Sequence, residues 1–474
     1  MTQKKCIVTD DEWTSNVLYF YIIVGANGVV MKKSQLSRNH IITDPIHGVM
    51  SFSKDEKELI KQFIDKPIFQ RLKRIKQLGC ADMVFPGAVH TRFSHSLGAC
   101  YIGKLVCDQL DINNGDRKII MGAALLHDIG HGPFSHAFES IFKGFGEGKI
   151  SHDKQWTPKF IDSFECDLKE DILNVFIDPN HHEYYDPLIA SQLDVDRLDY
   201  LLRDSHFCGV PYGNIDLQWI ISCMKQQEIN GDTVICITPK GIGAIEHYIL
   251  SRRLMTKYIY YHGKKNSSEY LISTFLKNLE GHLDIAELAQ SPLFLFMKNY
   301  FEYKRIINKN TDNNESNRND FVDNSFNYYK EITDDDIWIV LRRLSNEDSI
   351  AGRVAHKICN RELPNSFLIN PSRRFDAKKI IERYKDQEDE DNKWRIYFDE
   401  LNFESYGSKK IPIYVSDHNT VTDLYHSSNM LNQISDKPEP TYYVYIDAKH
   451  PKEEELLCEL SSYHCLVSPY FKSG

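Results

Sequence analysis

Three histidines and an aspartate lie close together in residues 125–136, which read LLHDIGHGPFSH. His127 and Asp128 are adjacent, and they follow the apolar run RKIIMGAALL at 117–126, which predicts a buried helix. An imidazole nitrogen and a carboxylate at the end of a helix can bind one metal ion before Gly130 ends the helix. A bare His–Asp pair is more often a helix-ending histidine with a capping aspartate, so the pair alone leaves both interpretations open.

Two further segments carry ligand-type side chains on predicted helices. The segment HTRFSHSLGACYIGKLV places His95 early in an amphipathic helix. In QLDVDRLDYLLRD, apolar residues recur at i, i+3 and i+7, and the other face carries Asp196, Tyr200 and Asp204. Such a polar face is usually only solvated. Together with His127 and Asp128, however, His95 and Asp196 would give two imidazoles and two carboxylates, a set that suits Mn, Fe, Zn or Mg. Such an ion can polarise a phosphoryl oxygen.

Composition sets limits on the class of protein. The chain has 474 residues with 42% hydrophobic content, enough for a large core and two or more domains. Its net charge of -10, from 57 basic and 67 acidic residues, argues against a dedicated surface for duplex nucleic acid.

The 11 cysteines are dispersed without a C-x-x-C pair, as is typical of reduced thiols in a cytoplasm. The apolar stretch 17–24 is too short for a membrane span and predicts a strand, and we see no export leader. We therefore expect a cytoplasmic protein with no membrane partner.

The order HTRFSHS, LLHDIGHGPFSH and DVDRLDYLLRD resembles the HD-domain deoxynucleoside triphosphohydrolases. These include bacterial HD phosphohydrolases and the animal enzyme that joins a SAM domain to an HD domain. The segments DPIHGVMSFS, FQRLKRIKQLG and VFPGAVHTRFSHSLG extend the resemblance from about His40 to His262, and more faintly to about residue 420. The resemblance implies a divalent metal ion held by His95, His127, Asp128 and Asp196.

The expected fold is mainly α: an HD-domain helical bundle with a smaller α+β C-terminal lobe. Helical periodicity dominates 55–271, and the short alternating segments IPIYV and TYYVYI predict strands near the C-terminus. The polar stretch NKNTDNNESNRND shows no apolar helical period. We predict four regions: an N-terminal strand-containing segment (1–36), the HD phosphohydrolase domain (37–307), a polar insertion or linker (308–327) and an α+β C-terminal region (328–474).

The resemblance also implies roles for residues beside the metal. It places His131, His136 and His152 around the α-phosphate, with His136 as the donor of a proton to the leaving 5′ oxygen of the sugar. Imidazole titrates in a range that suits this task. Glu139 stands where the family often has Asp, one helical turn after His136, and could orient that ring. Loop histidines that bond only to backbone are the plainer alternative.

Nine residues are expected to bind the substrate. Arg92 lies one helical turn before His95, where a bidentate donor would suit a triphosphate. By resemblance, Tyr200 and Arg252 bind phosphate, Gln77 and Asp204 hold the 3′ hydroxyl, and Tyr260 packs under the sugar. A tight sugar pocket excludes a 2′ hydroxyl and so favours deoxynucleotides. Arg197 replaces the family's usual Lys, and Tyr261 replaces a Gln beside the base, which leaves the preferred base open. The remaining member of the set is Leu78.

A regulatory nucleotide is a further expectation from the resemblance. Asp65 and Gln70 match positions that recognise an activating guanine nucleotide between subunits of the animal enzyme, while Lys73 replaces an Arg. Trp219 stands where another Arg would be expected, so the identity of an activator stays open. The resemblance also implies a homo-oligomer, as a dimer, tetramer or hexamer.

The leading prediction is a metal-dependent hydrolase that converts a deoxynucleoside triphosphate and water into deoxynucleoside and inorganic triphosphate. A preference for dGTP, control by nucleotides, and a role in nucleotide-pool control or antiviral defence are finer expectations. One alternative is an HD phosphohydrolase of another nucleotide, acting as a 5′-nucleotidase or phosphodiesterase. The other is a non-catalytic nucleotide sensor subunit.

Overall fold

The computed structural model describes residues 21–25, 28–32, 40–143, 145, 149–178, 181, 183–309, 314–403, 410–431 and 440–467. The chain divides into two units, 1–61 and 62–474. The first unit contains two antiparallel hairpins: β1 (Tyr21–Gly25) with β2 (Gly28–Lys32), and β3 (His40–Asp44) with β4 (Gly48–Phe52). The predicted N-terminal strand therefore exists over Tyr21–Gly25, whereas residues 17–20 lie outside the described residues.

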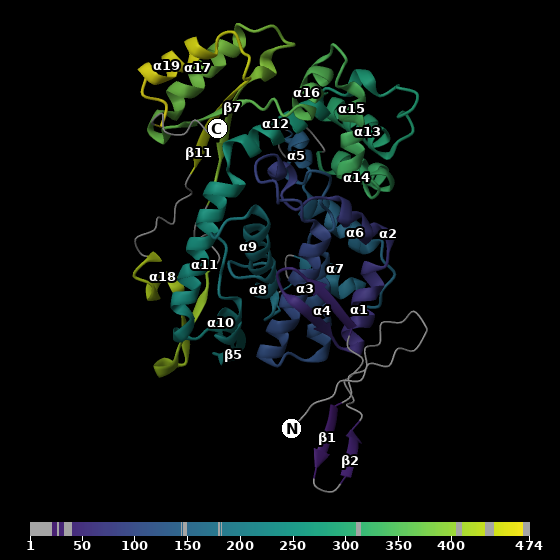
Figure 1. The fold of residues 1–474 in the computed structure, drawn as a ribbon, viewed down its shortest axis with the longest axis vertical. Helices are drawn as coiled ribbons and strands as arrows, with labels where there is room; N and C mark the ends of the chain where they lie inside the picture. The colour runs from purple at the N-terminus through teal and green to yellow at the C-terminus, as the bar shows by residue number, and fades with distance from the viewer. Residues whose placement is uncertain are drawn as a thin grey trace. The chain divides into compact units, whose positions relative to one another are not determined.

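The second unit is predominantly helical (Figure 1). After α1 (Lys54–Ile64), which crosses the boundary between the units, the helices are α2 (Pro67–Gln70), α3 (Arg92–Leu110), α4 (Asn114–Leu126), α5 (His136–Glu139), α6 (Thr157–Asp162), α7 (Lys169–Ile177), α8 (Asp186–Ile189), α9 (Val195–Cys208), α10 (Leu217–Ser222), α11 (Ile242–Met255), α12 (Gly263–Lys277), α13 (Pro292–Lys309), α14 (Asn314–Tyr329), α15 (Asp334–Leu344), α16 (Ile350–Cys359), α17 (Arg374–Asp386), α18 (Leu424–Ser427) and α19 (Glu453–Ser462). Short π-helical segments at His152–Trp156 and Thr256–Tyr260 complete the backbone near the site.

Three helices carry the predicted metal ligands, and they pack on one another. Helix α3 lies against both α4 and α9. Their contact faces are aliphatic: Ile102, Ile120 and Leu198 are completely buried in one hydrophobic core. Burial of each such side chain contributes about 1.5–3 kcal/mol. The apolar faces predicted from the sequence therefore fix the positions of the polar residues on the same helices.

A four-stranded sheet joins distant parts of the second unit. Its order is β10 (Thr420–Asp423), β9 (Pro412–Val415), β6 (Asp232–Ile237), β5 (Met224–Ile229), and β6 runs parallel to β9. The hairpin β5–β6 is an exception within 55–271, where we expected helical periodicity to dominate. Its turn, Asn230-Gly231, has positive φ at both residues, which Asn and Gly tolerate best and which matches the twist of a hairpin.

The C-terminal lobe contains a separate antiparallel sheet of order β7 (Asn365–Ile369), β11 (Thr441–Ile446), β8 (Ile396–Leu401). Alternate residues of TYYVYI enter the core, where Val444 packs with Ile381 of α17 and Leu456 of α19. This lobe, together with the helical remainder, confirms the expected fold class: mainly α with a smaller α+β lobe.

The stretch 308–327 differs from the predicted insertion or linker. Helix α13 continues to Lys309 and α14 begins at Asn314, while 310–313 lie outside the described residues. Phe321, Val322 and Phe326 of α14 are buried, and the ring of Phe321 lies 5.7 Å from that of Phe142. A few apolar residues on one face are therefore enough to dock this helix, although its polar composition hid the pattern.

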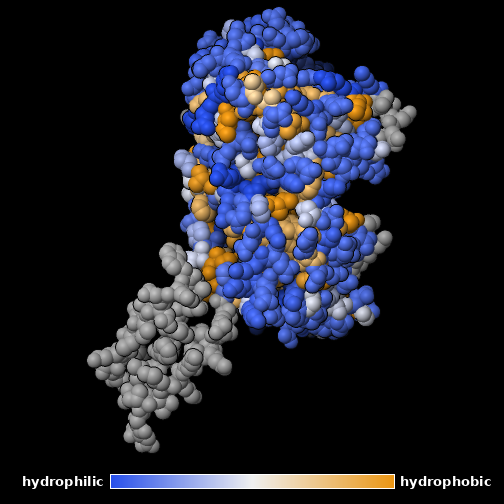
Figure 2. Space-filling view, turned by 90° about the vertical axis from the view of Figure 1, so that its right-hand side faces the viewer, coloured by the Kyte–Doolittle hydropathy of each residue, from blue (hydrophilic) through white to orange (hydrophobic). Residues whose placement is uncertain are grey.

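The molecular surface is mostly hydrophilic on the face that Figure 2 shows, and hydrophobic residues form smaller patches there. Across the described residues, none of the helices combines the length and apolar character that crossing a bilayer requires.

The boundaries of the four regions predicted from the sequence stay predictions.

Candidate active site

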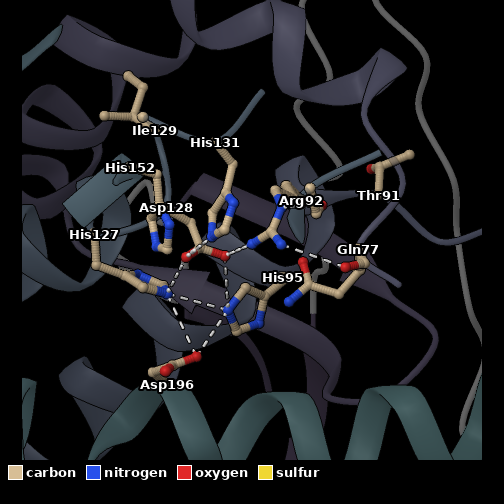
Figure 3. Close-up of polar contacts among 12 residues, drawn as sticks. Gln77, Thr91, Arg92, His95, His127, Asp128, Ile129, His131, His152 and Asp196 are labelled. Carbon is tan, nitrogen blue, oxygen red and sulfur yellow. Dashed lines mark hydrogen bonds and ion pairs between the residues drawn. The ribbon is translucent and has the colours of Figure 1, made fainter. Parts of the chain in front are cut away.

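His95 lies in the second turn of α3, and the start of this helix is well defined. The Thr91 side chain caps it by accepting from Ser94 N at 3.5 Å. His95 is fully buried, and its Nδ1 donates to Asp199 Oδ2 at 2.8 Å. The ring therefore presents Nε2 toward α4 and α9 (Figure 3).

His127 and Asp128 follow the last residue of α4, as the sequence predicts. His127 Nδ1 lies 2.8 Å from the backbone oxygen of Ala124. A carbonyl oxygen can only accept, so Nδ1 carries the hydrogen and Nε2 of the neutral ring keeps its lone pair. Asp196 approaches from the first turn of α9, which Asp194 caps by accepting from Arg197 N at 2.9 Å.

The four predicted metal ligands converge on one point (Figure 3). His95 Nε2 is 3.2 Å from His127 Nε2, and Asp196 Oδ1 is 3.0 Å and 3.4 Å from these two nitrogens. Asp128 completes the group, with oxygens 3.6 Å from His95 Nε2 and 3.4 Å from His127 Nε2. Ligands bonded to one ion at about 2.0–2.2 Å stand roughly 3 Å apart. Two imidazole nitrogens and two carboxylates therefore fit a divalent metal ion.

Electrostatics at this point favour a bound cation. Burial disfavours the charged form of His95, but hydrogen bonds with Asp196 and Asp199 outweigh burial and raise its pKa to about 10. Burial likewise opposes the charged form of His127, whose pKa is raised by Asp128 and Asp196. Conversely, the pKa of Asp128 is held well below its usual range against burial, chiefly by Arg92 and His127. The cluster thus attracts positive charge, which a divalent ion can supply in place of protons.

Asp199 contacts the nitrogen of His95 that points away from the other predicted metal ligands, and our sequence interpretation did not include it. Both of its oxygens accept from Arg203, at 2.8 Å and 2.9 Å, and Oδ2 also accepts from His95 Nδ1. Asp199 and Arg203 are completely buried. A carboxylate on the second nitrogen of a ligating histidine fixes the ring and increases its basicity. The i, i+4 spacing of Asp199 and Arg203 indicates their ion pair, but it does not reveal the contact of Asp199 with His95.

Arg92 connects the metal ligands to the loop that follows His131. Its guanidinium pairs with Asp128, and its Nε donates to Ser135 Oγ at 3.0 Å. Ser135 and Phe134 both have positive φ, an uncommon conformation for residues with side chains. Phe134 N donates to the buried Asp334 Oδ1 at 2.7 Å, which helps hold this conformation. Strained backbone of this kind is common at functional sites.

The predicted catalytic residues gather beside the metal ligands. The rings of His131 and His152 stack at 3.4 Å, and His136 lies 5.5 Å from His131 between ring centres. Burial, Arg92 and His152 lower the pKa of His131 well below its usual range, so this ring is neutral near pH 7. His136 is the accessible member, with 67% of its side chain exposed.

Glu139 lies between two of these histidines. Its Oε2 is 3.4 Å from His136 Nδ1 and 3.6 Å from His152 Nδ1, and its Oε1 accepts from His152 N at 3.1 Å. Despite its burial, the hydrogen bond with His136 and the nearby His152 ring keep the pKa of Glu139 well below its usual range. An ionised carboxylate at this place can orient the His136 ring.

The residues predicted to hold the sugar form a second buried group. Asp204 accepts from His90 Nε2 and from the hydroxyl of Tyr260, each at 2.8 Å. The rings of Tyr200 and Tyr260 meet edge to face at 6.0 Å, and Leu78 packs against the same core. His90, which the sequence interpretation missed, lies 5% exposed and stacks on Phe207.

Gln77 lies on the side of the Arg92 guanidinium away from Asp128 (Figure 3). Its backbone oxygen accepts from Arg92 Nη2 at 3.4 Å, and its side-chain Oε1 is buried without a hydrogen-bond partner. A buried amide oxygen that lacks a partner is costly, so an additional donor is favoured there. A ligand hydroxyl would be such a donor.

The predicted phosphate-binding arginines meet at one side chain. Arg252 Nη1 donates to Gln192 Oε1 at 2.5 Å, and Arg197 Nη1 donates to the same oxygen at 3.4 Å. The Tyr200 hydroxyl belongs to this region, and burial raises its pKa to about 12, so it stays protonated. Tyr261 points elsewhere, because its hydroxyl donates to Asn402 O at 2.6 Å.

The predicted regulatory residues are not all brought together. Gln70 lines a cavity of about 680 Å³ and donates to Ile64 O at 2.6 Å. Lys73 Nζ instead lies 4.6 Å from the ring centre of Phe93, and neither Lys73 nor the exposed Asp65 is among the residues that line this cavity. The structure therefore supplies a cavity at Gln70 without the predicted trio.

Comparison with protein families gives the class of this site. The HD domain family model matches residues 92–204, which begin at Arg92, end at Asp204 and include all four predicted metal ligands. The chain contains an HD domain, and this domain with its His/Asp cluster supports a metal-dependent phosphohydrolase.

Individual relatives extend the comparison beyond this domain. The uncharacterized protein YwfO of Bacillus subtilis is 28% identical over 443 residues, which cover 90% of this chain and 94% of YwfO. The deoxynucleoside triphosphate triphosphohydrolase SAMHD1 homolog of Dictyostelium discoideum is 30% identical over 281 residues, so the match spans about half of each chain (55% and 53%). The crystal structure of a phosphohydrolase from Bacteroides thetaiotaomicron aligns with a TM-score of 0.68 and 27% identity, covering 86% of this chain and 99% of that one.

Proposed function

We propose that this protein is a metal-dependent deoxynucleoside triphosphate triphosphohydrolase, which converts a deoxynucleoside triphosphate and water into deoxynucleoside and inorganic triphosphate. The observation that carries the proposal is the approach of His95 Nε2 and His127 Nε2 to 3.2 Å, with oxygens of Asp128 and Asp196 at 3.0–3.6 Å from these nitrogens, beside Arg92 and three further imidazoles. The likeness to SAMHD1 proteins supports the choice of substrate.

The four converging ligands would hold the divalent ion. Such an ion, when bound, supplies Lewis acidity toward a phosphoryl oxygen. Arg92 adds a fixed positive charge beside it, because its guanidinium is anchored by Asp128 and by Ser135 Oγ at 3.0 Å. A guanidinium held in this way neutralises charge that develops on the α-phosphate without reorganisation.

Water attacks the α-phosphorus, a new phosphorus–oxygen bond forms, and the bond to the sugar's O5′ breaks. His136 donates a proton to O5′, which would otherwise leave as an alkoxide. Its exposure allows a proton from solvent to restore the ring, while the attacking water releases its own proton to solvent. Glu139, 3.4 Å from His136 Nδ1, orients the ring for this step. His131 is kept neutral by burial and cannot take this role near pH 7.

The Asp204 group would bind the sugar. Asp204 and Gln77 offer acceptors for a 3′ hydroxyl, and the Tyr260 ring, fixed by its 2.8 Å bond to Asp204, would leave no room for a 2′ hydroxyl. We extend the proposal to a dGTP preference, an activating nucleotide in the cavity at Gln70, a homo-oligomer and a cytoplasmic role in nucleotide-pool control or antiviral defence.

Chromatography of the products tests the proposal. Purified protein with Mg or Mn is incubated with each of the four deoxynucleoside triphosphates and with GTP, singly and in pairs. Deoxynucleoside together with intact triphosphate is the expected result, and the paired incubations reveal an activator. Release of monophosphate, or hydrolysis of another nucleotide instead, would favour the alternative HD phosphohydrolase, and tight binding without turnover would favour a sensor subunit.

A further inference from the structure

Gln192 occupies a buried position between the two arginines that would bind the substrate's phosphates. It lies in the loop between α8 and α9 and is 7% exposed. Its side-chain oxygen accepts from Arg252 Nη1 at 2.5 Å and from Arg197 Nη1 at 3.4 Å. Its backbone oxygen accepts from the hydroxyl of the fully buried Tyr248 at 2.6 Å. The Tyr248 hydroxyl thus fixes the backbone of Gln192, and the side chain of Gln192 contacts both guanidinium groups.

The acceptor that Gln192 offers is neutral. Arg197 and Arg252 are half-buried, and arginines that are removed from water usually pair with carboxylates, which would cancel their charge. Among the described residues, no carboxylate lies within 4 Å of the Arg252 guanidinium, and the ring of Phe403 lies 5.7 Å from its Cζ. Arg197 has one carboxylate neighbour, Asp194, at 3.6 Å from its Nε. An amide between the two arginines therefore fixes their positions and leaves most of their charge available.

The same groups lie next to the metal ligands in the chain. Arg197 directly follows Asp196 on α9, and the segment of α9 that carries Tyr200 continues toward Asp204. In the proposed complex, the phosphate chain begins at the metal ligands and extends over Arg197 toward Arg252. Only a substrate with more than one phosphate can extend along this path to both arginines.

We propose that Gln192 is a specificity-determining residue, which positions Arg197 and Arg252 through a neutral acceptor, so that the two arginines select a polyphosphate tail over a monophosphate. This inference rests on the proposed function for the identity of the substrate. The predicted quantity is the affinity for the polyphosphate tail, which can be measured without turnover.

The test uses three variants of the full chain and inorganic tripolyphosphate as the probe, with orthophosphate for comparison. Gln192→Glu keeps the shape but adds a negative charge, Gln192→Met keeps the approximate shape but removes the acceptor, and Gln218→Glu adds the same charge at an exposed position of α10. Binding is measured by calorimetry in the presence of Mg, and retained Mn binding at the HD site shows that each variant is folded there.

Gln192→Glu should weaken tripolyphosphate binding by roughly tenfold or more, because the new carboxylate pairs with the arginines. Gln192→Met should weaken it by a smaller factor, and orthophosphate binding should change little in either variant. Gln218→Glu should bind as the wild type does. Wild-type affinity for tripolyphosphate in either Gln192 variant, or an equal loss for orthophosphate, would overturn the proposal.

Turnover separates this inference from the proposed function. If the wild type binds tripolyphosphate in a Gln192-dependent way but hydrolyses no deoxynucleotide, the proposed function fails and the polyphosphate site stands. If it hydrolyses deoxynucleotides and Gln192→Glu leaves KM unchanged, the proposed function stands and the role of Gln192 fails.

Discussion

His95 Nε2 lies 3.2 Å from His127 Nε2, and each ring uses its other nitrogen in a 2.8 Å hydrogen bond, with Asp199 and with the backbone oxygen of Ala124. Two lone pairs that face each other at this distance repel unless a positive charge lies between them. Asp196 Oδ1, 3.0 Å from the first nitrogen, strengthens the preference for a cation. The helices α3, α4 and α9 hold this geometry through their shared core, so the site is preorganised for a metal ion.

Metal should stabilise the fold, and chelation should remove that stabilisation. A ligand at a hundred times its Kd adds about 2.7 kcal/mol to the free energy of unfolding. We expect a chelator to lower the melting temperature and added Mn to restore it. The double variant His127→Ala with Asp128→Ala should remain folded but show neither metal-dependent stabilisation nor turnover.

A matched control for this variant exists in another His–Asp pair. His181 Nδ1 lies 2.9 Å from Asp186 Oδ1, away from the predicted ligands in the chain. His181→Ala with Asp186→Ala should keep both the metal effect and the activity. Full turnover in the His127/Asp128 variant would show that the metal site is assigned wrongly.

Asp199 should tune metal affinity without touching the metal. Asp199→Asn should weaken Mn binding roughly 10- to 100-fold, because His95 loses the carboxylate that orients it. The change also removes the Asp199 carboxylate from the buried Arg203 guanidinium, which is destabilising. Asp199→Asn with Arg203→Met removes the buried positive charge as well, so calorimetry on both variants separates metal affinity from stability. Wild-type Mn affinity in both variants would exclude the orienting role.

Gly98 is required by the approach of α9 to α3. A Cβ at this position would overlap the Asp199 carboxylate and the Arg203 guanidinium, whereas a Cβ at Gly103 of the same helix would meet Ala124 and Ile120 at an ordinary 3.7 Å. Gly98→Ala should therefore lower the free energy of unfolding by about 1–3 kcal/mol and weaken metal binding. Gly103→Ala should be neutral or slightly stabilising, since alanine favours helix. Equal melting temperatures for the two variants would contradict this account.

Asp334 should make stability depend on pH. Burial raises its pKa to about 6, against the hydrogen bonds from the backbone of Lys76 and Phe134. An unfolded aspartate titrates near ~3.9, so the folded chain binds this proton more tightly. The resulting stabilisation is fully present below about pH 4 and is lost as pH rises through about 6, by at most about 3 kcal/mol.

The Asp334→Asn variant isolates this effect, because asparagine does not titrate. The difference in free energy of unfolding between wild type and Asp334→Asn should fall as pH rises from about 4 to 6. Parallel stability curves for wild type and Asp334→Asn would mean that the folded pKa is not raised.

The sequence predicted the helices that bear the ligands because their apolar periodicity is strong, as in α4, which ends one residue before His127. It missed the β5–β6 hairpin, although Asn230-Gly231 is a strong turn signal, and it missed α14, whose few apolar residues are scattered among polar ones. Asp199 and Gln192 escaped notice for another reason. Their roles depend on partners such as His95 and Arg252 that lie far away in the chain, and helical spacing does not reveal such contacts.

Hydrolysis in ¹⁸O-labelled water tests the central claim most directly, because it identifies the bond that breaks. The protein is incubated with Mn and a deoxynucleoside triphosphate, and the products are analysed by mass spectrometry. Attack of water on the α-phosphorus predicts unlabelled deoxynucleoside and inorganic triphosphate that carries one ¹⁸O atom. Deoxynucleoside monophosphate with pyrophosphate, or label in the 5′ hydroxyl of the deoxynucleoside, would contradict it.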